Sequence, residues 1–327
     1  MQTVTIQNVW DIYRQDLIRV EKQILKNLST HVPAIPMVVK HLLQGGGKRI
    51  RPLLLILSSR LGAYNEDEAV ILAGIVESIH SASLLHDDVV DGADMRRGKP
   101  SAHSIWGNQI TILVGDYLYS NALKIGVALK SQRIMDVLSE ATTRMTEGEL
   151  FQLSKIGDPD ITEAEYFRII EAKTGVLISA SCRLGAITGR LDRGKEDALG
   201  AFGMKLGTAF QMADDILDYM ADENKLGKTL GKDLKEGKIT IPLIHLLNVS
   251  SRQEAGLTKG IIRKEETSAE DLDCILELLR RYKAIDYSID RARRLIDDAK
   301  AELMAFADSD IRDAMLAVAD YVLNRER

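Results

Sequence analysis

Residues 66–91 read EDEAVILAGIVESIHSASLLHDDVVD, a long apolar run that ends in a cluster of three aspartates. Its apolar residues recur at steps of three and four, which is the period of a helix rather than of a strand. Residues four apart stack on one face of a helix, so Asp87 and Asp91 point the same way, with Asp88 beside them. The run therefore predicts a long helix that presents an acidic cluster at its end.

The chain has 327 residues, and most of the rest of it shows the same helical period, with few period-two runs. Glycine- or proline-bearing breaks separate the helical runs at 45–47, 98–100, 157–159 and 227–237. No low-complexity linker and no shift in composition divides the chain, so we expect a single all-α domain over 1–327. The expected helices lie near 34–44, 52–61, 66–91, 105–130, 132–153, 163–188, 195–222, 241–249, 269–282, 286–304 and 309–324.

An N-terminal helix and a polar segment complete this outline. The apolar residues of the first segment would line one face of a helix, and the more polar segment 250–270 is expected to be a surface excursion. Pro52 and Pro242 each open an apolar run, which suits the first position of a helix. The expected N-terminal face consists of Trp10, Tyr13, Leu17, Val20, Ile24, Leu25 and Leu28.

Composition excludes several classes of protein. With 45% hydrophobic residues the chain can bury a large core, and 43 Lys and Arg against 48 Asp and Glu give a net charge of -5. This balance lacks the basic surface that favours a nucleic-acid backbone. Cys182 and Cys274 show no CxxC spacing, which argues against a disulfide framework or a zinc site. No signal-peptide h-region and no apolar run of about 18–20 residues is evident, so we expect a soluble, cytoplasmic protein.

The aspartate pattern occurs a second time, as Asp214-Asp215-Ile216-Leu217-Asp218, within another apolar helical run. Three like charges on a helix repel one another unless a cation lies among them. Magnesium suits such oxygen-rich sites, because it keeps several waters and bridges carboxylates to substrate phosphates. One cluster alone could equally be a solvated acidic helix end. Two clusters on separate long helices favour a cavity in which several metal ions hold a diphosphate.

Basic residues accompany both acidic clusters. Arg96-Arg97-Gly98 follows the first cluster, and its guanidinium groups can bind phosphate oxygens in bidentate pairs. The stretch GGGKRIRP at 45–52 joins a glycine loop to a helix start, an arrangement that favours an anion site but lacks the Walker A spacing. After the second cluster, the segment 227–240 carries lysines beside glycines and is expected to act as a flap over phosphates. A single glycine–lysine pair is usually a surface turn, so the interpretation depends on the ordered combination.

In these motifs the sequence resembles the trans-prenyltransferase family, the short- and long-chain isoprenyl diphosphate synthases. The stretches GGGKRIRP, ESIHSASLLHDDVVDGADMRRGKP, EGELFQL, EAKTG, GTAFQMADDILDY and GKTLGKDLKEGKITIPL follow the family's order, and the resemblance covers essentially the whole chain. It is greatest to the octaprenyl diphosphate synthases and related long-chain enzymes of quinone side-chain synthesis. The resemblance implies an all-α bundle of the isoprenoid synthase type around a deep central cavity. It also implies a homodimer and magnesium as cofactor, with three ions when substrate is bound.

The resemblance also assigns the site residues. Isopentenyl diphosphate would contact Lys48, Arg51, His80 and Arg97. Magnesium would be held, directly or through water, by Asp87, Asp88, Asp91, Asp214, Asp215 and Asp218. The allylic diphosphate would contact Arg96, Lys173, Gln211, Lys228 and Lys238, and Thr174 with Gln211 would face the developing cation. The expected catalytic residues are therefore Lys173, Thr174, Gln211 and Arg96. His80 and Gln211 could equally be satisfied polar groups between packed helices.

The expected activity is the addition of successive isopentenyl diphosphates to an allylic diphosphate, preferably farnesyl diphosphate, to give a long chain such as octaprenyl diphosphate. The alternatives are a short- or medium-chain synthase, giving farnesyl or geranylgeranyl diphosphate, and a non-catalytic partner subunit. A di-iron bundle is disfavoured because Glu77 and His80 form the only ExxH pair. A terpene cyclase would not need GGGKRIRP for a second diphosphate. At most a peripheral membrane contact is expected, for product release.

Product length is expected to depend on Ala82 and Ser83, which stand five and four positions before Asp87. They would lie about one helical turn below the reacting carbon, where the growing chain must pass. In short-chain members of the family a bulky aromatic side chain stands there and blocks growth. Both residues are small here, so we expect a tunnel that stays open beyond farnesyl length. The alternative is that small residues only let two helices pack closely.

Overall fold

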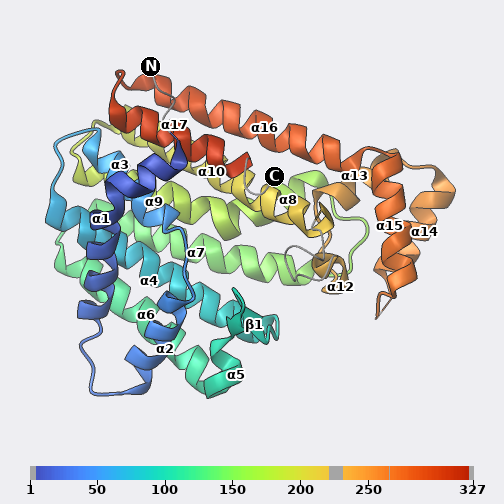
Figure 1. Ribbon diagram of the computed structural model, residues 1–327, viewed down its shortest axis with the longest axis horizontal. Coiled ribbons are helices and arrows are strands. Elements are labelled where there is room, and N and C mark those ends of the chain that lie inside the picture. The colour runs from blue at the N-terminus through green and yellow to red at the C-terminus, as the bar shows by residue number, and fades with distance from the viewer. Residues whose placement is uncertain (1–4, 221–230, 265, 324–327) are drawn as a thin grey trace. The chain divides into compact units, whose positions relative to one another are not determined.

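A computed structural model describes residues 5–220, 231–264 and 266–323 of the chain (Figure 1). Helices dominate this part of the chain, and its only strands are the two-residue β1 (Met95–Arg96) and β2 (Lys99–Pro100). The strands pair antiparallel, with Met95 opposite Pro100, and form a small hairpin. The expected all-α fold is confirmed, since one such hairpin builds no core of its own.

Contacts between residues divide the described chain into two compact units, and neither unit is continuous in sequence. Unit 1 contains residues 5–142, 177–200 and 303–318. Unit 2 contains the described residues of 143–176, 201–302 and 319–323. No change in composition marks the crossings, and a single domain over 1–327 stays a prediction.

Unit 1 is built around α4 (Glu66–Val90), the helix expected from the acidic run. Its most extensive packing is against α6, α3 and α1. The side chain of the N-cap Asn65 accepts a hydrogen bond from the amide of Glu68, and acidic residues in the first turn complement the helix dipole. The other helices wholly in this unit are α1 (Ile6–Asn27), α2 (Ala34–Gln44), α3 (Ile50–Arg60), α5 (Ala102–Trp106) and α6 (Asn108–Ala128).

By length and apolar composition, α4 could cross a membrane, although no uninterrupted apolar run in the sequence suggested this. In the structure, 72% of its most apolar stretch is buried inside the protein. A helix buried in a protein core can be as long and as apolar as a membrane-spanning helix. Burial therefore accounts for the apolar sequence of α4. No second helix in the described residues meets the same criteria.

The buried face of α1 agrees with the predicted one at Tyr13, Val20 and Ile24 and differs from it elsewhere. Its buried residues are Val9, Tyr13, Asp16, Val20 and Ile24. Asp16 is tolerated there because Arg60 pairs with its carboxylate at 2.8 Å. Leu25 is exposed, and Trp10 and Leu17 line an open cavity instead.

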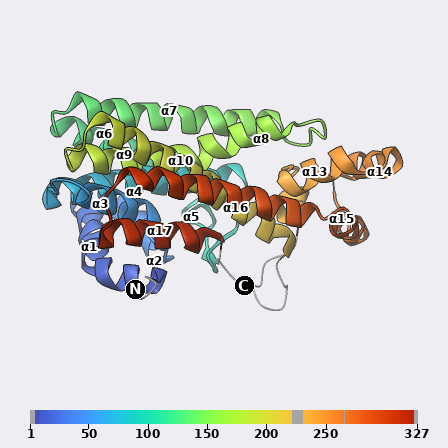
Figure 2. The ribbon, with the colours of Figure 1, turned by 90° about the horizontal axis from the view of Figure 1, so that it is seen from above.

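Unit 2 has its core where α13 (Ile241–Val249) packs on α16 (Ala284–Glu302). The α13 sequence IPLIHLLNV is apolar almost all round, which suits a helix that also packs on α14, α15 and α8. Figure 2 shows α13, α14 and α15 gathered near one end of α16. The other helices wholly in this unit are α8 (Glu163–Ile170), the π-helical turn η1 (Glu171–Gly175), α12 (Lys232–Lys235), α14 (Arg252–Ile262) and α15 (Ala269–Arg281).

Most predicted helices agree with the structure to within a few residues, and three segments differ. Gly107, with φ 81°, divides the segment 105–130 into α5 and α6. The π-helical turn interrupts the helix expected at 163–188. The segment 250–270 contains α14, whose few buried residues the polar composition concealed. Residues of both units occur in α7 (Gln132–Ser154), α9 (Val176–Thr188), α10 (Arg193–Met220) and α17 (Asp310–Leu323), and the short η2 (Leu303–Ala305) belongs to unit 1.

Within unit 1, α9 lies very close to α3. A methyl group built on Gly185 would approach the carbonyl oxygen of Leu55 to 2.3 Å and Cβ of Ser58 to 2.6 Å. One turn later, a methyl group on Gly189 would meet the carbonyl oxygen of Ser59 at 2.6 Å. The two glycines therefore let the two backbones touch, and any side chain there would force them apart.

We expect Gly185→Ala to destabilise the protein by about 1–3 kcal/mol, because the added methyl group overpacks backbone atoms that cannot turn aside. Gly256 in α14 provides the control, since nothing lies within 4 Å of a methyl group there. Gly256→Ala should raise stability by about 0.5–1 kcal/mol through its better helix propensity. Urea unfolding followed by circular dichroism measures both changes. Equal unfolding midpoints for the two variants would contradict the close approach of α9 to α3.

Candidate active site

The first acidic cluster lies at the C-terminal end of α4, in unit 1. Asp88 is 1% exposed, and its Oδ1 accepts a hydrogen bond from Nε of Arg96 at 2.7 Å. Its second oxygen, Oδ2, is buried and has no hydrogen-bond partner in the part of the chain that the structure describes. Asp87 and Asp91 are more accessible than Asp88. The expected acidic helix end is thus present, and it includes a buried carboxylate oxygen that suits a cation.

The β1–β2 hairpin contacts the glycine loop, which we define as residues 45–49. Nη1 of Arg97 donates a hydrogen bond to the carbonyl oxygen of Gly46. A methyl group on Gly47 would meet the Arg97 guanidinium at 2.7 Å, so the arginine lies directly against the backbone of Gly47. The structure therefore brings Arg97 against the glycine loop that carries Lys48, two residues that the family resemblance assigns to one diphosphate.

Arg49 anchors the glycine loop. Its Nη1 donates a hydrogen bond to Glu77 and its Nε donates to Glu21, both at 3.0 Å. The residue has φ 46°, in the left-handed region that non-glycine residues rarely adopt. These contacts hold Arg49 in a structural role, and the assignment of ligand binding to Lys48 and Arg51 stays a prediction. They also make Glu77 an ion-pair partner rather than one of a di-iron pair.

His80 lies on α4 in a strongly cationic environment. Burial lowers the pKa of His80 well below its ordinary value, and the charges of Arg51, Arg97, Arg96 and Arg49 lower it further. The imidazole is therefore neutral near pH 7 and offers one N–H donor and one acceptor. So many guanidinium groups around one neutral side chain indicate a site that favours an anion.

Ala82 and Ser83 precede the first acidic cluster by about one turn of α4. Ala82 is fully buried. Ser83 is half-buried, and its Oγ donates a hydrogen bond to the carbonyl oxygen of His80 at 2.9 Å. Their positions follow the predicted spacing, and the tunnel that they are expected to border stays a prediction.

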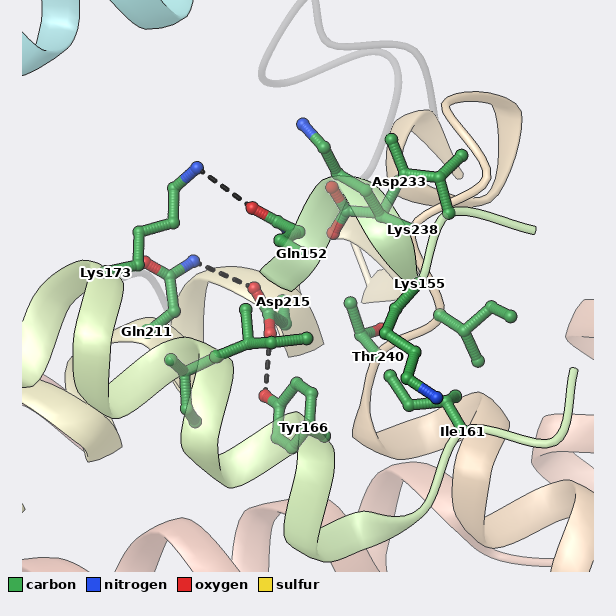
Figure 3. A pocket seen from close by; sticks show the side chains of 14 residues that line it. Gln152, Lys155, Ile161, Tyr166, Lys173, Gln211, Asp215, Asp233, Lys238 and Thr240 are labelled. Atoms are coloured by element: carbon green, nitrogen blue, oxygen red, sulfur yellow. Dashed lines mark hydrogen bonds between the residues drawn. The ribbon is translucent and has the colours of Figure 1, made fainter. Parts of the chain in front are cut away.

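The second acidic cluster lies on α10, in unit 2, and its central carboxylate belongs to a chain of hydrogen bonds (Figure 3). Oη of Tyr166 donates to Oδ2 of Asp215 at 2.6 Å, and Nε2 of Gln211 donates to Oδ1 at 2.9 Å. Oγ1 of Thr174 in turn donates to Oε1 of Gln211 at 2.7 Å. The buried Asp215 accepts hydrogen bonds on both of its oxygens. Gln211 must therefore turn its amide nitrogen toward Asp215, which gives its side chain one defined orientation.

The carboxylates of Asp218 and Asp233 lie near that of Asp215 and interact with it electrostatically. The carboxylate of Asp218 accepts hydrogen bonds from the amides of Lys232 at 3.2 Å and Asp233 at 3.0 Å, in the first turn of α12. Burial, with repulsion between these carboxylates, raises the pKa of Asp215 to about 6 and that of Asp233 to about 8. Crowded, buried acids of this kind attract a cation. Sequence analysis did not select Asp233, for which the neighbouring glycine–lysine pair was the only signal.

Lys173 and Thr174 stand in η1, the π-helical turn between α8 and α9. Such turns are rare and occur frequently at functional sites. Nζ of Lys173 pairs with Glu149 at 2.9 Å and donates a hydrogen bond to Oε1 of Gln152 at 3.2 Å. The π-helical turn therefore carries one expected phosphate ligand and one expected cation-facing hydroxyl.

A cavity of about 100 Å³ in unit 2 has both acidic and cationic side chains in its lining (Figure 3). Its polar lining includes Asp215 and Asp233 together with Lys173 and Lys238. Lys155, which sequence analysis did not select, also lines it. Two of the expected allylic-site lysines thus share one cavity with the second acidic cluster. Lys228, the third, lies outside the described residues.

The residues present fit a divalent cation. Within residues 5–220, 231–264 and 266–323, no three His, Cys, Asp or Glu side chains form a closed metal site by themselves. Magnesium usually completes its octahedron with water and substrate phosphate, so an open set of carboxylates suits it. The buried Oδ2 of Asp88 and the crowded carboxylates of Asp215, Asp218 and Asp233 are oxygen donors of the required kind.

Comparison with known proteins agrees with these features. The family model described as polyprenyl synthetase matches residues 32–279. The chain is 37% identical over 324 residues to the octaprenyl diphosphate synthase of Escherichia coli (strain K12), an alignment that covers 99% of this chain and 100% of that protein.

Two solved structures are similar over nearly their full length. The polyprenyl synthase from Caulobacter crescentus CB15, complexed with calcium and isoprenyl diphosphate, is 37% identical with a TM-score of 0.92, and the match covers 99% of each chain. The decaprenyl diphosphate synthase from Rhodobacter capsulatus is 35% identical with a TM-score of 0.94, and the match covers 98% of this chain and 99% of that one. The chain therefore belongs to the polyprenyl synthetase family of prenyltransferases.

Proposed function

We propose that this protein is a magnesium-dependent trans-polyprenyl diphosphate synthase. It would condense an allylic diphosphate, preferably farnesyl diphosphate, with successive isopentenyl diphosphates to give octaprenyl diphosphate for quinone side chains. The observation that carries the proposal is the 37% identity, over the full chain, with an octaprenyl diphosphate synthase. A decaprenyl diphosphate synthase is 35% identical, so the exact length of the product needs its own test. A short- or medium-chain product, farnesyl or geranylgeranyl diphosphate, is the alternative.

The acidic clusters would hold magnesium. When bound, the metal would neutralise the allylic diphosphate and stabilise it as a leaving group. The buried carboxylates support this assignment, because their mutual repulsion is relieved by a cation. Lys173 and Lys238, which line the cavity beside the second cluster, would bind the same diphosphate. The proposed ligands are Asp87, Asp88, Asp91, Asp214, Asp215 and Asp218, with three ions when substrate is present.

The isopentenyl diphosphate would bind at the glycine loop. Lys48, Arg51 and Arg97 would supply the charge, while Arg49 stays with its two glutamates. His80, kept neutral by burial and by the nearby guanidinium groups, would donate one hydrogen bond. At this site cationic side chains, rather than metal ions, would bind the diphosphate. This suits isopentenyl diphosphate, whose diphosphate group does not leave during the reaction.

Gln211 and Thr174 would face the carbocation that forms when the allylic diphosphate departs. Nε2 of Gln211 donates to Asp215, which directs the opposite, oxygen end of the amide toward Thr174. Fixed oxygen dipoles of this kind stabilise positive charge only where water is excluded, since water would also quench the cation. The alkene of isopentenyl diphosphate attacks the cation, and the released diphosphate takes the proton that is lost as the new trans double bond forms.

We also propose that the protein forms a homodimer in the cytoplasm, with at most peripheral membrane contact during product release. Exposed apolar residues on α6 support an interface on that helix. Leu113 is 65% exposed and Val127 is 60% exposed, and Ile112 is also exposed on the same helix. A single domain over the whole chain is part of this proposal.

Asp87→Ala should lower kcat by a few hundredfold or more, since the loss of one metal ligand removes about 3–4 kcal/mol of leaving-group stabilisation. The measurement is incorporation of labelled isopentenyl diphosphate at saturating magnesium, with circular dichroism to confirm the helical fold. Asp67→Ala is the matched control, because this acid lies on the same helix at its exposed N-terminal end. Near-normal turnover in Asp87→Ala would refute the metal assignment.

Arg51→Ala should raise KM for isopentenyl diphosphate more than KM for the allylic primer. The physical reason is that Arg51 belongs to the metal-free cationic site at the start of α3. The loss of one charge-assisted contact should cost about tenfold or more in KM. Steady-state kinetics with each substrate varied in turn makes the comparison. An equal rise in KM for both substrates would show that Arg51 is not specific to the isopentenyl diphosphate site.

Ser83→Phe should shift the products toward farnesyl or geranylgeranyl diphosphate while condensation continues. Ser83 is half-buried, so an aromatic ring there can enter an open tunnel. Ala82→Tyr tests the second position, but Ala82 is fully buried and overpacking is expected to lower its stability as well. Thin-layer sizing of the dephosphorylated products gives the result. Full-length products from Ser83→Phe, or a wild-type enzyme that already stops at farnesyl, would contradict the open-tunnel prediction.

A further inference from the structure

One face of α1 lies along the glycine loop in unit 1, and both line an open cavity of about 480 Å³. The loop contributes Gly47, Lys48 and Arg49 to its lining. The helix contributes residues at steps of three and four, which share one side of a helix. The main ones are Trp10, Arg14, Leu17, Ile18 and Glu21.

Two residues of this face hold the loop directly. Nε1 of Trp10 donates a hydrogen bond to the carbonyl oxygen of Lys48 at 3.1 Å. The Lys48 ammonium also lies over the indole ring, 5.5 Å from its centroid. About three turns along α1, Glu21 accepts a hydrogen bond from Nε of Arg49 at 3.0 Å. The helix therefore fixes two consecutive residues of the loop.

The glycine loop needs such anchors because its backbone is unusual. Gly46, Gly47 and Arg49 have φ values of 79°, 151° and 46°. A non-glycine residue in the left-handed region costs about 1 kcal/mol or more, and persists only where its surroundings hold it. Lys48 lies within this segment and is exposed, so packing alone does not set the direction of its side chain. A flexible lysine also loses side-chain entropy when it is ordered by a ligand.

We propose that Trp10 is a positioning residue for isopentenyl diphosphate, which acts by directing Lys48 toward the phosphate. The inference rests on the proposed function, in which Lys48 contacts that diphosphate. The hydrogen bond fixes the Lys48 backbone, and the ring face restricts the ammonium before the ligand arrives, so less entropy is lost on binding. The indole acts through Lys48 and not on the reacting atoms. Its removal therefore changes KM for isopentenyl diphosphate and leaves kcat almost unchanged.

Two substitutions separate the hydrogen bond from the ring. Trp10→Phe keeps an aromatic face and loses the N–H, and should raise KM for isopentenyl diphosphate about threefold. Trp10→Leu loses both contacts and should raise it about five- to tenfold, with kcat within twofold of wild type and KM for farnesyl diphosphate unchanged. Leu17→Ala is the matched control, because it removes apolar bulk from the same cavity and helix face. An unchanged KM in Trp10→Leu, or an equal rise in Leu17→Ala, would overturn the proposal.

A double-mutant cycle with Lys48→Gln distinguishes failure of this inference from failure of the proposed function. If Trp10 acts through Lys48, Trp10→Leu should raise KM little further in a Lys48→Gln background. If the two substitutions raise KM independently, so that their fold-changes multiply, the positioning role of Trp10 is overturned. In that case, a raised KM in the single variant Lys48→Gln would still support the assignment of Lys48 to the diphosphate site. No effect of Lys48→Gln itself would refute both the assignment of Lys48 and the inference built on it.

Fluorescence provides a readout that a purely structural role would not change. The chain has only two tryptophans, Trp10 and Trp106, so Trp106→Phe leaves Trp10 as the sole indole emitter. Isopentenyl diphosphate added without primer should change its emission in a saturable way, because an anion on the Lys48 ammonium alters the field at the ring. The half-saturation point gives the dissociation constant of isopentenyl diphosphate, and Lys48→Gln should abolish the change. Emission that stays constant through saturation would overturn the proposal.

Discussion

Carboxylates placed where water is scarce must find donors or cations, and both acidic clusters are arranged around this requirement. In unit 1, Arg96 of the hairpin donates to the buried Asp88. In unit 2, Tyr166 and Gln211 donate to the buried Asp215, and the first amides of α12 donate to the acid one turn further along α10. Gln211 lies on α10 itself, whereas Arg96, Tyr166 and the α12 amides come from elements outside the helix that carries the acids. The hairpin, α8 and α12 are therefore tied to the clusters by the same interactions that keep the carboxylates in place.

Lys48 and Arg49, neighbouring cations of the glycine loop, take different roles because their surroundings differ. The side chain of Arg49 is largely buried, and it is paired with the equally buried Glu77. A buried ion pair requires well-made hydrogen bonds on both sides, which commits both residues to structure. Lys48, one position earlier, is exposed, and its ammonium lies over the indole ring of Trp10. A lysine in that setting keeps its charge near the surface, where an incoming phosphate can reach it.

The helices could be predicted from the sequence because the apolar period of three to four residues records which side of each helix is buried. The acidic clusters could be predicted for the same reason, since their spacing is a property of one helix. The roles of Arg49 and Asp233 could not, because their partners are distant in sequence: Glu21 and Glu77 for the arginine, and the α10 acids for the aspartate. The helix α14 escaped prediction because it buries only a short stripe that includes Ile261 and Ile262.

The N-terminal face shows how a correctly predicted helix, with Tyr13, Val20 and Ile24 buried as expected, can still carry a partly wrong assignment of burial. The apolar residues of α1 predict that Trp10 belongs to the core, yet the core takes Val9 and Asp16 instead. An aspartate can replace a hydrophobic residue there because Arg60 lies opposite, a pairing that no local pattern shows. The indole is amphipathic, with an apolar ring and one N–H donor, and it is placed where both can be used.

The two candidate length-determining residues differ in the same way. Successive residues of a helix are turned by about 100°, so Ser83 lies within about 40° of Asp87, whereas Ala82 lies about 140° away from it. Burial follows this geometry, because Ala82 is fully buried in the core of unit 1 and Ser83 is half-buried. A growing chain that starts at the acidic end of α4 must pass along the side that Asp87 shares. Ser83 is therefore the stronger candidate for the tunnel wall, and for Ala82 both tunnel lining and close helix packing stay open until the substitutions are tested.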